Sequence, residues 1–243
     1  LHLLSRRQRQ MCIRDSINIK EYRELSKSYI MAIAKSALFH ELNGSLGNLI
    51  IYKVGDQIRV RGKTSHYRDA KSETQLKQRS KVKTIAKLFS FLDLQLHVYW
   101  KQLTVGTTLS GYNLFFKENI RYAGEAEAIE DFNSFKICKG VVPLPADIEV
   151  KFHPDKQVTL KWNIQSSDVM RNHDCLQLAA FTPYKKRNPK IRIIATTETQ
   201  RKAGYYAFQI PDSLEKPAYL YAFFKSKYTN EISDSYYLGG TEE

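Results

Sequence analysis

The apolar residues of this chain change their spacing close to Pro143, and this change limits the possible folds more than any other feature. Ahead of Pro143, apolar side chains recur at steps of three and four residues, at Val82, Ile85, Phe89, Leu92, Leu96, Tyr99 and Leu103. Such steps place side chains on one face of a helix. Residues 74–103 contain no Gly or Pro. They therefore predict one continuous amphipathic helix, a rod of roughly 45 Å, with Ser72 and Gln75 at capping-box spacing before it.

Behind Pro143 the apolar residues alternate with polar ones. Val158, Leu160 and Trp162 are separated by Thr159 and Lys161, which gives a strand one apolar and one wet face. The same pattern predicts seven short strands, at residues 148–152, 158–164, 175–181, 191–196, 205–210, 219–225 and 233–238. This number and spacing of strands is typical of a small β-sandwich.

Two more elements complete the expected fold. Residues 49–54 and 57–60 are rich in β-branched residues, and Gly55 with Asp56 between them predicts a hairpin turn. A second helix is expected over residues 111–122. The predicted class is α+β, with an N-terminal β-hairpin and a long amphipathic helix followed by the seven-stranded sandwich. The prolines in residues 141–147 predict a linker between a basic hairpin-plus-helix domain at 31–140 and a sandwich domain at 148–243.

The first residues are excluded from this interpretation. Residues 6–16 read RRQRQMCIRDS, which resembles an in-frame translation of adapter DNA from a transposase-based sequencing kit. This resemblance implies that residues 1–30 are a non-native leader, and Met31 is the candidate start. A native amphipathic extension over residues 17–30 is the open alternative. Residues 1–30 hold seven Lys/Arg and three Asp/Glu, so residues 31–243 keep 31 basic and 22 acidic side chains, a net charge of +9 instead of +13.

Most of this remaining charge lies in one segment. Between Arg59 and Lys87, ten basic side chains stand against Asp69 and Glu73, a net charge of +8. The candidate contact residues for an acidic partner or for nucleic acid are Arg59, Arg61, Lys63, Arg79, Lys83 and Lys87. The last three recur at steps of four, which predicts a basic stripe beside the apolar one on the helix. Phosphate backbones attract such stripes through counterion release, whereas a face exposed to solvent is the other interpretation.

Motifs that would carry catalysis are incomplete or absent in the sequence. Gly62, Lys63 and Thr64 look like the end of a phosphate-binding loop, but Gln57 stands where the loop needs its first Gly. The histidines are scattered, without a second ligand at metal-binding spacing. His173 and Cys175 lie two residues apart and lack further catalytic partners nearby in sequence. We therefore expect no enzyme activity, no cofactor, no metal and no small-molecule ligand.

Two stretches of the second half resemble fibronectin type III modules. VTLKW at residues 158–162 is similar to the Trp-bearing second strand of these modules. YLYAFFKSKYTNEISDSYYL at residues 219–238 is similar to their last two strands. The resemblance covers residues 147–240 and implies that Trp162 packs in the core of the sandwich.

A second resemblance extends over most of the chain from Met31. GSLGNLIIYKVGDQIRVRGK at residues 44–63, followed by TQLKQR at residues 74–79, resembles the start of an uncharacterised Bacteroidota family, domain of unknown function number 6266. The Gln and Arg of that family's helix start stand at other steps from Thr74 here. The resemblance implies a bacterial source and a sandwich-like second half, and it implies no chemistry.

The sequence thus favours a non-catalytic structural or protein-interaction protein of bacterial or phage-like origin. Its expected partner is another protein or a second copy of itself. Nucleic-acid binding through the basic segment 59–87 is the alternative, and an enzyme whose site is assembled across the fold is a second one. No signal peptide or membrane span follows Met31, so we expect a cytoplasmic protein or a component of an assembled particle.

Overall fold

The computed structural model describes most of the chain after Met31. The described residues are 31–34, 43–64, 69–124, 128–164, 169–183, 189–214 and 216–241. They combine helices with antiparallel β-sheets, so the α+β class is confirmed. Contacts divide the chain into two compact units, Leu1–Asp69 and Ala70–Glu243. The proposed leader at residues 1–30 lies outside the described residues.

The first unit contains a four-stranded antiparallel sheet. Its strands are β1 (Met31–Ala34), β2 (Gly44–Leu46), β3 (Leu49–Val54) and β4 (Gln57–Gly62), in the order β1-β4-β3-β2. Strands β3 and β4 form the predicted hairpin, and Gly55 in its turn has a φ of 59°, a conformation that glycine adopts without strain. The hairpin is therefore confirmed, and the sheet adds a strand on each side of it.

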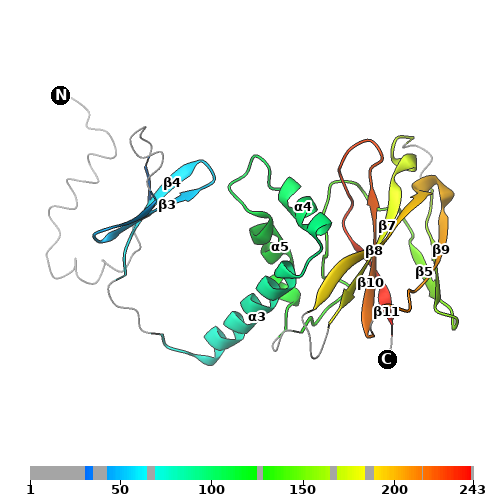
Figure 1. The fold of residues 1–243 in the computed structure, drawn as a ribbon, viewed down its shortest axis with the longest axis horizontal. Coiled ribbons are helices and arrows are strands. Elements are labelled where there is room, and N and C mark those ends of the chain that lie inside the picture. The colour runs from blue at the N-terminus through cyan, green and yellow to red at the C-terminus, as the bar shows by residue number, and fades with distance from the viewer. Residues whose placement is uncertain are drawn as a thin grey trace, which may run out of the picture. The chain divides into compact units, whose positions relative to one another are not determined.

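The second unit begins with three helices, drawn in cyan to green in Figure 1. They are α3 (Glu73–Ser90), α4 (Leu94–Gln102) and α5 (Gly111–Asn119), and a short 3-10 turn, η2 (Ile120–Tyr122), follows α5. The hydroxyl of Ser72 accepts a hydrogen bond from the backbone N–H of Gln75 at 3.4 Å. Such N-terminal capping satisfies one of the free donors of the first turn, as the spacing predicts.

The prediction of one continuous helix over residues 74–103 is wrong, because the chain leaves helical geometry between α3 and α4. Leu92 forms a parallel bridge with Ile191, and the N–H of Asp93 donates to the carbonyl of Ile191 at 2.9 Å. The carboxylate of Asp93 then caps α4 by accepting from the N–H of Gln95 at 2.9 Å. A pairing with a distant strand thus replaces one helical turn, and a good capping residue starts a new helix.

Two antiparallel sheets make up the rest of this unit. One contains β5 (Glu149–Phe152), β6 (Gln157–Lys161) and β9 (Tyr205–Gln209), in the order β5-β6-β9. The other has the order β11-β10-β7-β8. Its strands are β7 (Cys175–Thr182), β8 (Lys190–Gln200), β10 (Ala218–Lys225) and β11 (Tyr236–Thr241).

The central strands β7 and β10 are buried on both faces. Leu178 and Leu220 belong to a core cluster shared with Val158 of β6, whereas Phe181 and Phe223 belong to a cluster shared with the helices. Successive residues of a strand point to opposite faces, so the β11-β10-β7-β8 sheet is covered by the helices on one face and by the β5-β6-β9 sheet on the other. The second unit is therefore built in three layers, as Figure 1 shows.

This arrangement differs from the expected division at residues 141–147. The helices and the two sheets lie in one compact unit, and the division between units falls after Asp69. Val142 in the expected linker is buried, and its N–H donates to the carbonyl of Ile232 at 2.9 Å. The helices bury their apolar stripe against β7 and β10, which explains why they do not form a separate core.

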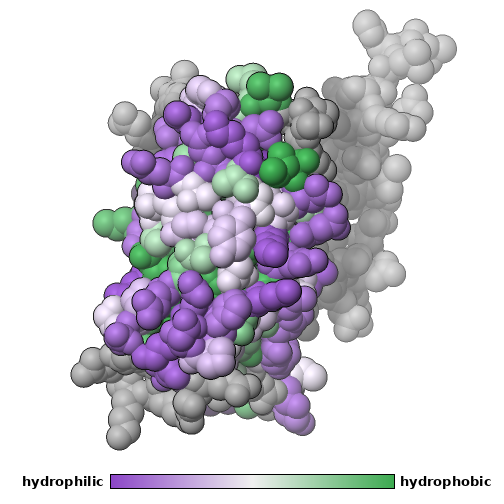
Figure 2. All heavy atoms as spheres, turned by 90° about the vertical axis from the view of Figure 1, so that its right-hand side faces the viewer, coloured by the Kyte–Doolittle hydropathy of each residue, from purple (hydrophilic) through white to green (hydrophobic). Residues whose placement is uncertain are grey.

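The outer face of the β5-β6-β9 sheet is the wet face that the alternation predicts. Glu149 and Lys161 pair in register and are both exposed, whereas their neighbours Val150 and Leu160 turn toward the core. The side of the unit on which β5 and β9 lie is mostly hydrophilic in Figure 2. Trp162, next to β6, is buried in the core between the sheets, and its ring N–H donates to the carbonyl of Arg201 at 2.6 Å.

Candidate functional site

The six predicted contact residues lie on two different units. Arg59, Arg61 and Lys63 belong to the unit Leu1–Asp69, on β4 and just after it. Arg59 is directly opposite Tyr52 in the sheet, and Arg61 is opposite Ile50, so the two arginines share one face with an aromatic and an aliphatic residue. Arg61 and Lys63 are exposed, and Arg59 is half-buried.

The other three contact residues follow α3. Arg79 and Lys83 are exposed and Lys87 is half-buried, one on each of three successive turns. Residues 73–79, the first two turns of the helix, are exposed throughout. Two neighbouring lysines make ion pairs, Lys77 with Glu73 at 2.9 Å and Lys81 with Glu130 at 3.9 Å. The predicted stripe is present on α3, but neither unit by itself brings all six basic residues together.

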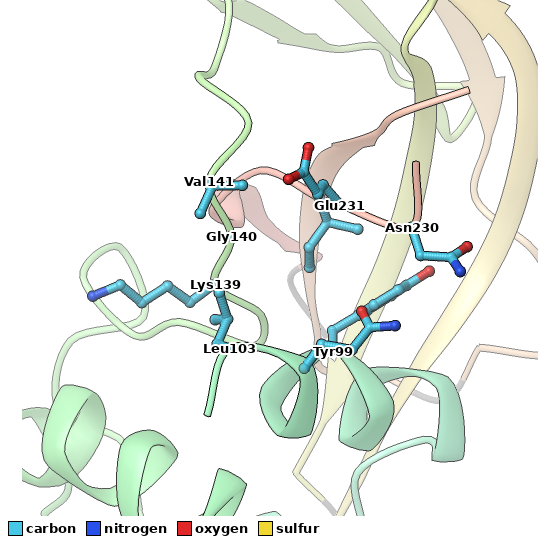
Figure 3. A pocket seen from close by; sticks show the side chains of 9 residues that line it. Tyr99, Leu103, Lys139, Gly140, Val141, Asn230 and Glu231 are labelled. Carbon is cyan, nitrogen blue, oxygen red and sulfur yellow. The ribbon is translucent and has the colours of Figure 1, made fainter. Parts of the chain in front are cut away.

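A pocket of about 380 Å³ lies in the second unit, where three chain segments meet. It is lined by Tyr99, Gln102 and Leu103 at the end of α4, by residues 139–141, and by residues 230–232 between β10 and β11 (Figure 3). Gly140 allows this meeting, because an added Cβ would stand 1.7 Å from the carbonyl oxygen of Ile232. No motif of the sequence predicts this pocket.

The two charged side chains that line the pocket, Lys139 and Glu231, are each paired with a residue outside its lining. Lys139 extends away from the labelled residues of the opposite wall in Figure 3, and its Nζ lies 2.9 Å from a carboxylate oxygen of Glu118. The carboxylate of Glu231 accepts a hydrogen bond from the hydroxyl of Thr229 at 3.1 Å. Burial raises the pKa of Tyr99, so this phenol stays protonated at neutral pH. The pocket is thus suited to an apolar or neutral group.

Side chains with nucleophilic or metal-binding chemistry are not gathered in the described part of the chain. Burial raises the pKa of Cys138 well above its ordinary value, which disfavours the reactive thiolate. Cys175 and His173 are neighbours, but the ring of His173 is hydrogen-bonded to Gln200 at 3.1 Å. Among the described residues, no three His, Cys, Asp or Glu side chains are grouped as a metal ion requires.

Helix α4 presents apolar residues on both of its faces. Leu96, Tyr99 and Trp100 are buried in the core. On the other face Leu94 is 82% exposed and Val98 is 49% exposed, and residues four apart on a helix are neighbours. Leu94 and Val98 do not belong to the apolar stripe of the sequence. Their position outside that stripe could have identified them as exposed apolar residues.

Comparison with protein-family models, with curated proteins and with solved structures gave no match. Within the described ranges, no helix has both the length and the apolar character of a membrane span.

Proposed function

We propose that this chain is a non-catalytic structural or protein-interaction protein of bacterial or phage-like origin. The observation that carries the proposal is the exposed pair Leu94 and Val98 on α4. Two large apolar side chains on adjacent turns gain free energy when a partner removes them from water. The opposite face of α4 is fixed in the core, so the exposed pair is held on a rigid support.

The two packed sheets support a more specific proposal, a sandwich of the fibronectin type III kind. Their strand orders, β5-β6-β9 and β11-β10-β7-β8, agree with an arrangement in which the Trp-bearing second strand lies in the smaller sheet. Residues 219–238, which carry the resemblance, run from β10 into β11. A module of this kind offers edge strands and end loops for contacts. The resemblance to the Bacteroidota family implies a sandwich-like second half, and the two packed sheets are consistent with that proposed relation.

The test uses the full chain and the proteins encoded beside it on the source DNA. Sedimentation velocity is recorded for the chain alone and with each neighbour protein. We expect a complex that is lost when Leu94→Asp and Val98→Asp are combined, because two charges cannot be buried in an apolar contact. Val169→Asp is the matched control, since Val169 is 69% exposed and is not part of α4. A chain that sediments as a monomer in every mixture would contradict the proposal.

Nucleic-acid binding is the second candidate, and the stripe of Arg79, Lys83 and Lys87 favours it. These side chains follow one side of α3 at the spacing of successive turns, so they can contact neighbouring phosphates. The arginines on β4 belong to the other unit and would add to the affinity as a second contact. A salt titration, described in the Discussion, distinguishes this candidate from the first.

A further inference from the structure

The second unit has four strand edges that can accept another strand, and three of them are protected. The edge strands are β11 and β8 in one sheet and β5 and β9 in the other. Strand β8 is paired with Leu92 at one end and contains two register shifts. Strand β11 has a register shift in its pairing, and the ring of Phe152 lies against Gly239. Strand β5 carries the exposed charges Glu149 and Lys151. Bulges and charges are the usual means by which proteins prevent edge pairing.

Strand β9 has none of these protections within the described residues. Its sequence is Tyr-Tyr-Ala-Phe-Gln, without charge or proline, and its pairing with β6 is regular over all five residues. Beyond the strand, the carbonyl of Gly204 accepts from the N–H of Trp162, and the N–H of Ile210 donates to the carbonyl of Lys156, both at 3.0 Å. Hydrogen-bonded residues alternate along an antiparallel strand. The backbone groups of Tyr205, Ala207 and Gln209 therefore point to the open edge.

We propose that β9 pairs with β9 of a second copy of this chain, antiparallel and around a twofold axis at Ala207. Ala207 then bonds to its own copy, and Tyr205 bonds to Gln209 of the other chain, which gives about six new backbone hydrogen bonds. The pairing continues the β5-β6-β9 sheet across the axis. This inference goes beyond the proposed function, because it adds a contact surface other than Leu94 and Val98, with a second copy of the chain as its partner.

Side chains on both faces of the strand suit this register. Tyr206 faces Phe208 of the second copy in the closer type of residue pair, and aromatic cross-strand pairs stabilise a sheet. Both rings are half-buried in the single chain, so the second copy covers the remainder.

The test is sedimentation equilibrium of the full chain over a wide range of protein concentration. We expect a dimer for the native chain and for Ala207→Gln, which adds a neutral side chain on the solvent face. We expect loss of the dimer for Ala207→Lys and for Ala207→Glu, because each places like charges directly opposite one another. Mixing the two charged variants should restore a dimer with one chain of each kind. Hydrogen exchange at the amide of Ala207 should become slower as the dimer forms.

The outcomes separate this inference from the proposed function. A dimer that Ala207→Lys and Ala207→Glu leave intact, but that Leu94→Asp with Val98→Asp removes, would keep the proposed function and overturn the β9 pairing. A chain that is a strict monomer and still binds a neighbour protein would also keep the proposed function and overturn the β9 pairing. Loss of the dimer in both charged variants without its return in their mixture would also overturn the register at Ala207.

Discussion

Arg201, shortly before β9, and Asp174, just before β7, form a buried ion pair. Nη2 of Arg201 lies 3.5 Å from Oδ2 of Asp174, and the two side chains are only 6% and 1% exposed. The same nitrogen donates to the carbonyl of Pro143 at 2.6 Å, and the guanidinium carbon lies 4.9 Å from the centre of the Phe224 ring. The pair thus fixes residue 143 of the expected linker against the sheets.

Removing one member of this pair should destabilise the chain strongly. In Arg201→Ala, the buried carboxylate of Asp174 loses the guanidinium that faces it, and the hydrogen bond to the carbonyl of Pro143 is lost as well, so we expect the free energy of unfolding to fall by roughly 3–5 kcal/mol. Urea denaturation measures the loss. Lys202→Ala, at an exposed neighbouring position, should change stability little. Equal effects of the two substitutions would show that the ion pair does not hold this region.

The close approach at Gly140 gives a second prediction. A Cβ at this position would meet backbone atoms of residue 232, so Gly140→Ala forces the two segments apart. We expect a loss of about 3 kcal/mol in the free energy of unfolding, the upper end of the usual cost of overpacking, measured by the same denaturation. Val141→Ala is the control, because Val141 is 60% exposed. A stable Gly140→Ala variant would mean that the segments at the pocket do not meet as described.

His97 should make stability depend on pH. Burial lowers its pKa below the ordinary value and outweighs the nearby carboxylate of Asp93, which raises it. The unfolded chain therefore takes up the proton first as the pH falls. The contribution of the neutral His97 ring to the free energy of unfolding is fully present above about pH 6.5. It is lost as the pH falls from there through the lowered pKa of the folded state. His97→Gln should reduce the fall in unfolding free energy between about pH 7 and 5. An unchanged pH profile in this variant would contradict the assignment.

The nucleic-acid candidate predicts a specific dependence on salt. Binding of the full chain to duplex DNA is measured by fluorescence anisotropy at several salt concentrations. If Arg79, Lys83 and Lys87 each contact a phosphate, replacing all three by Gln should reduce the slope of log K against log salt by about 2.7. Lys151→Gln combined with Lys156→Gln and Lys202→Gln, on the other side of the unit, is the control. Absence of binding at low salt would exclude this candidate.

The sequence predicts local features of this fold better than long-range ones. The glycine turn of the hairpin and the Ser72 cap are properties of a few neighbouring residues, and both are found. The break at Leu92 could not be seen, because Leu92 keeps the same apolar spacing whether a helix runs through it or ends there. What ends α3 is the pairing with Ile191, about a hundred residues further along the chain.

The sequence contains one feature that indicates the three-layer arrangement, and the expected division into domains did not take it into account. Residues 219–224 are apolar or aromatic without interruption, and such runs are typical of strands that are buried on both faces. A strand of this kind needs a second cover besides the facing sheet, and the helices provide it. By contrast, the pocket is built from residues near positions 100, 140 and 231, and no local pattern connects such distant segments.

The proposed function and the β9 pairing both depend on Ala70–Glu243 being one folded unit with fixed outer surfaces. The chain has two tryptophans, and they lie in different cores, Trp100 with the helices and Trp162 between the sheets. Urea unfolding followed by fluorescence in Trp100→Phe and in Trp162→Phe therefore reports each core separately. After correction for the stability that each substitution removes, we expect both probes to show a single transition with the same slope and free energy. Two independent transitions, with the helical core unfolding while Trp162 stays buried, would contradict this structure and support separate domains.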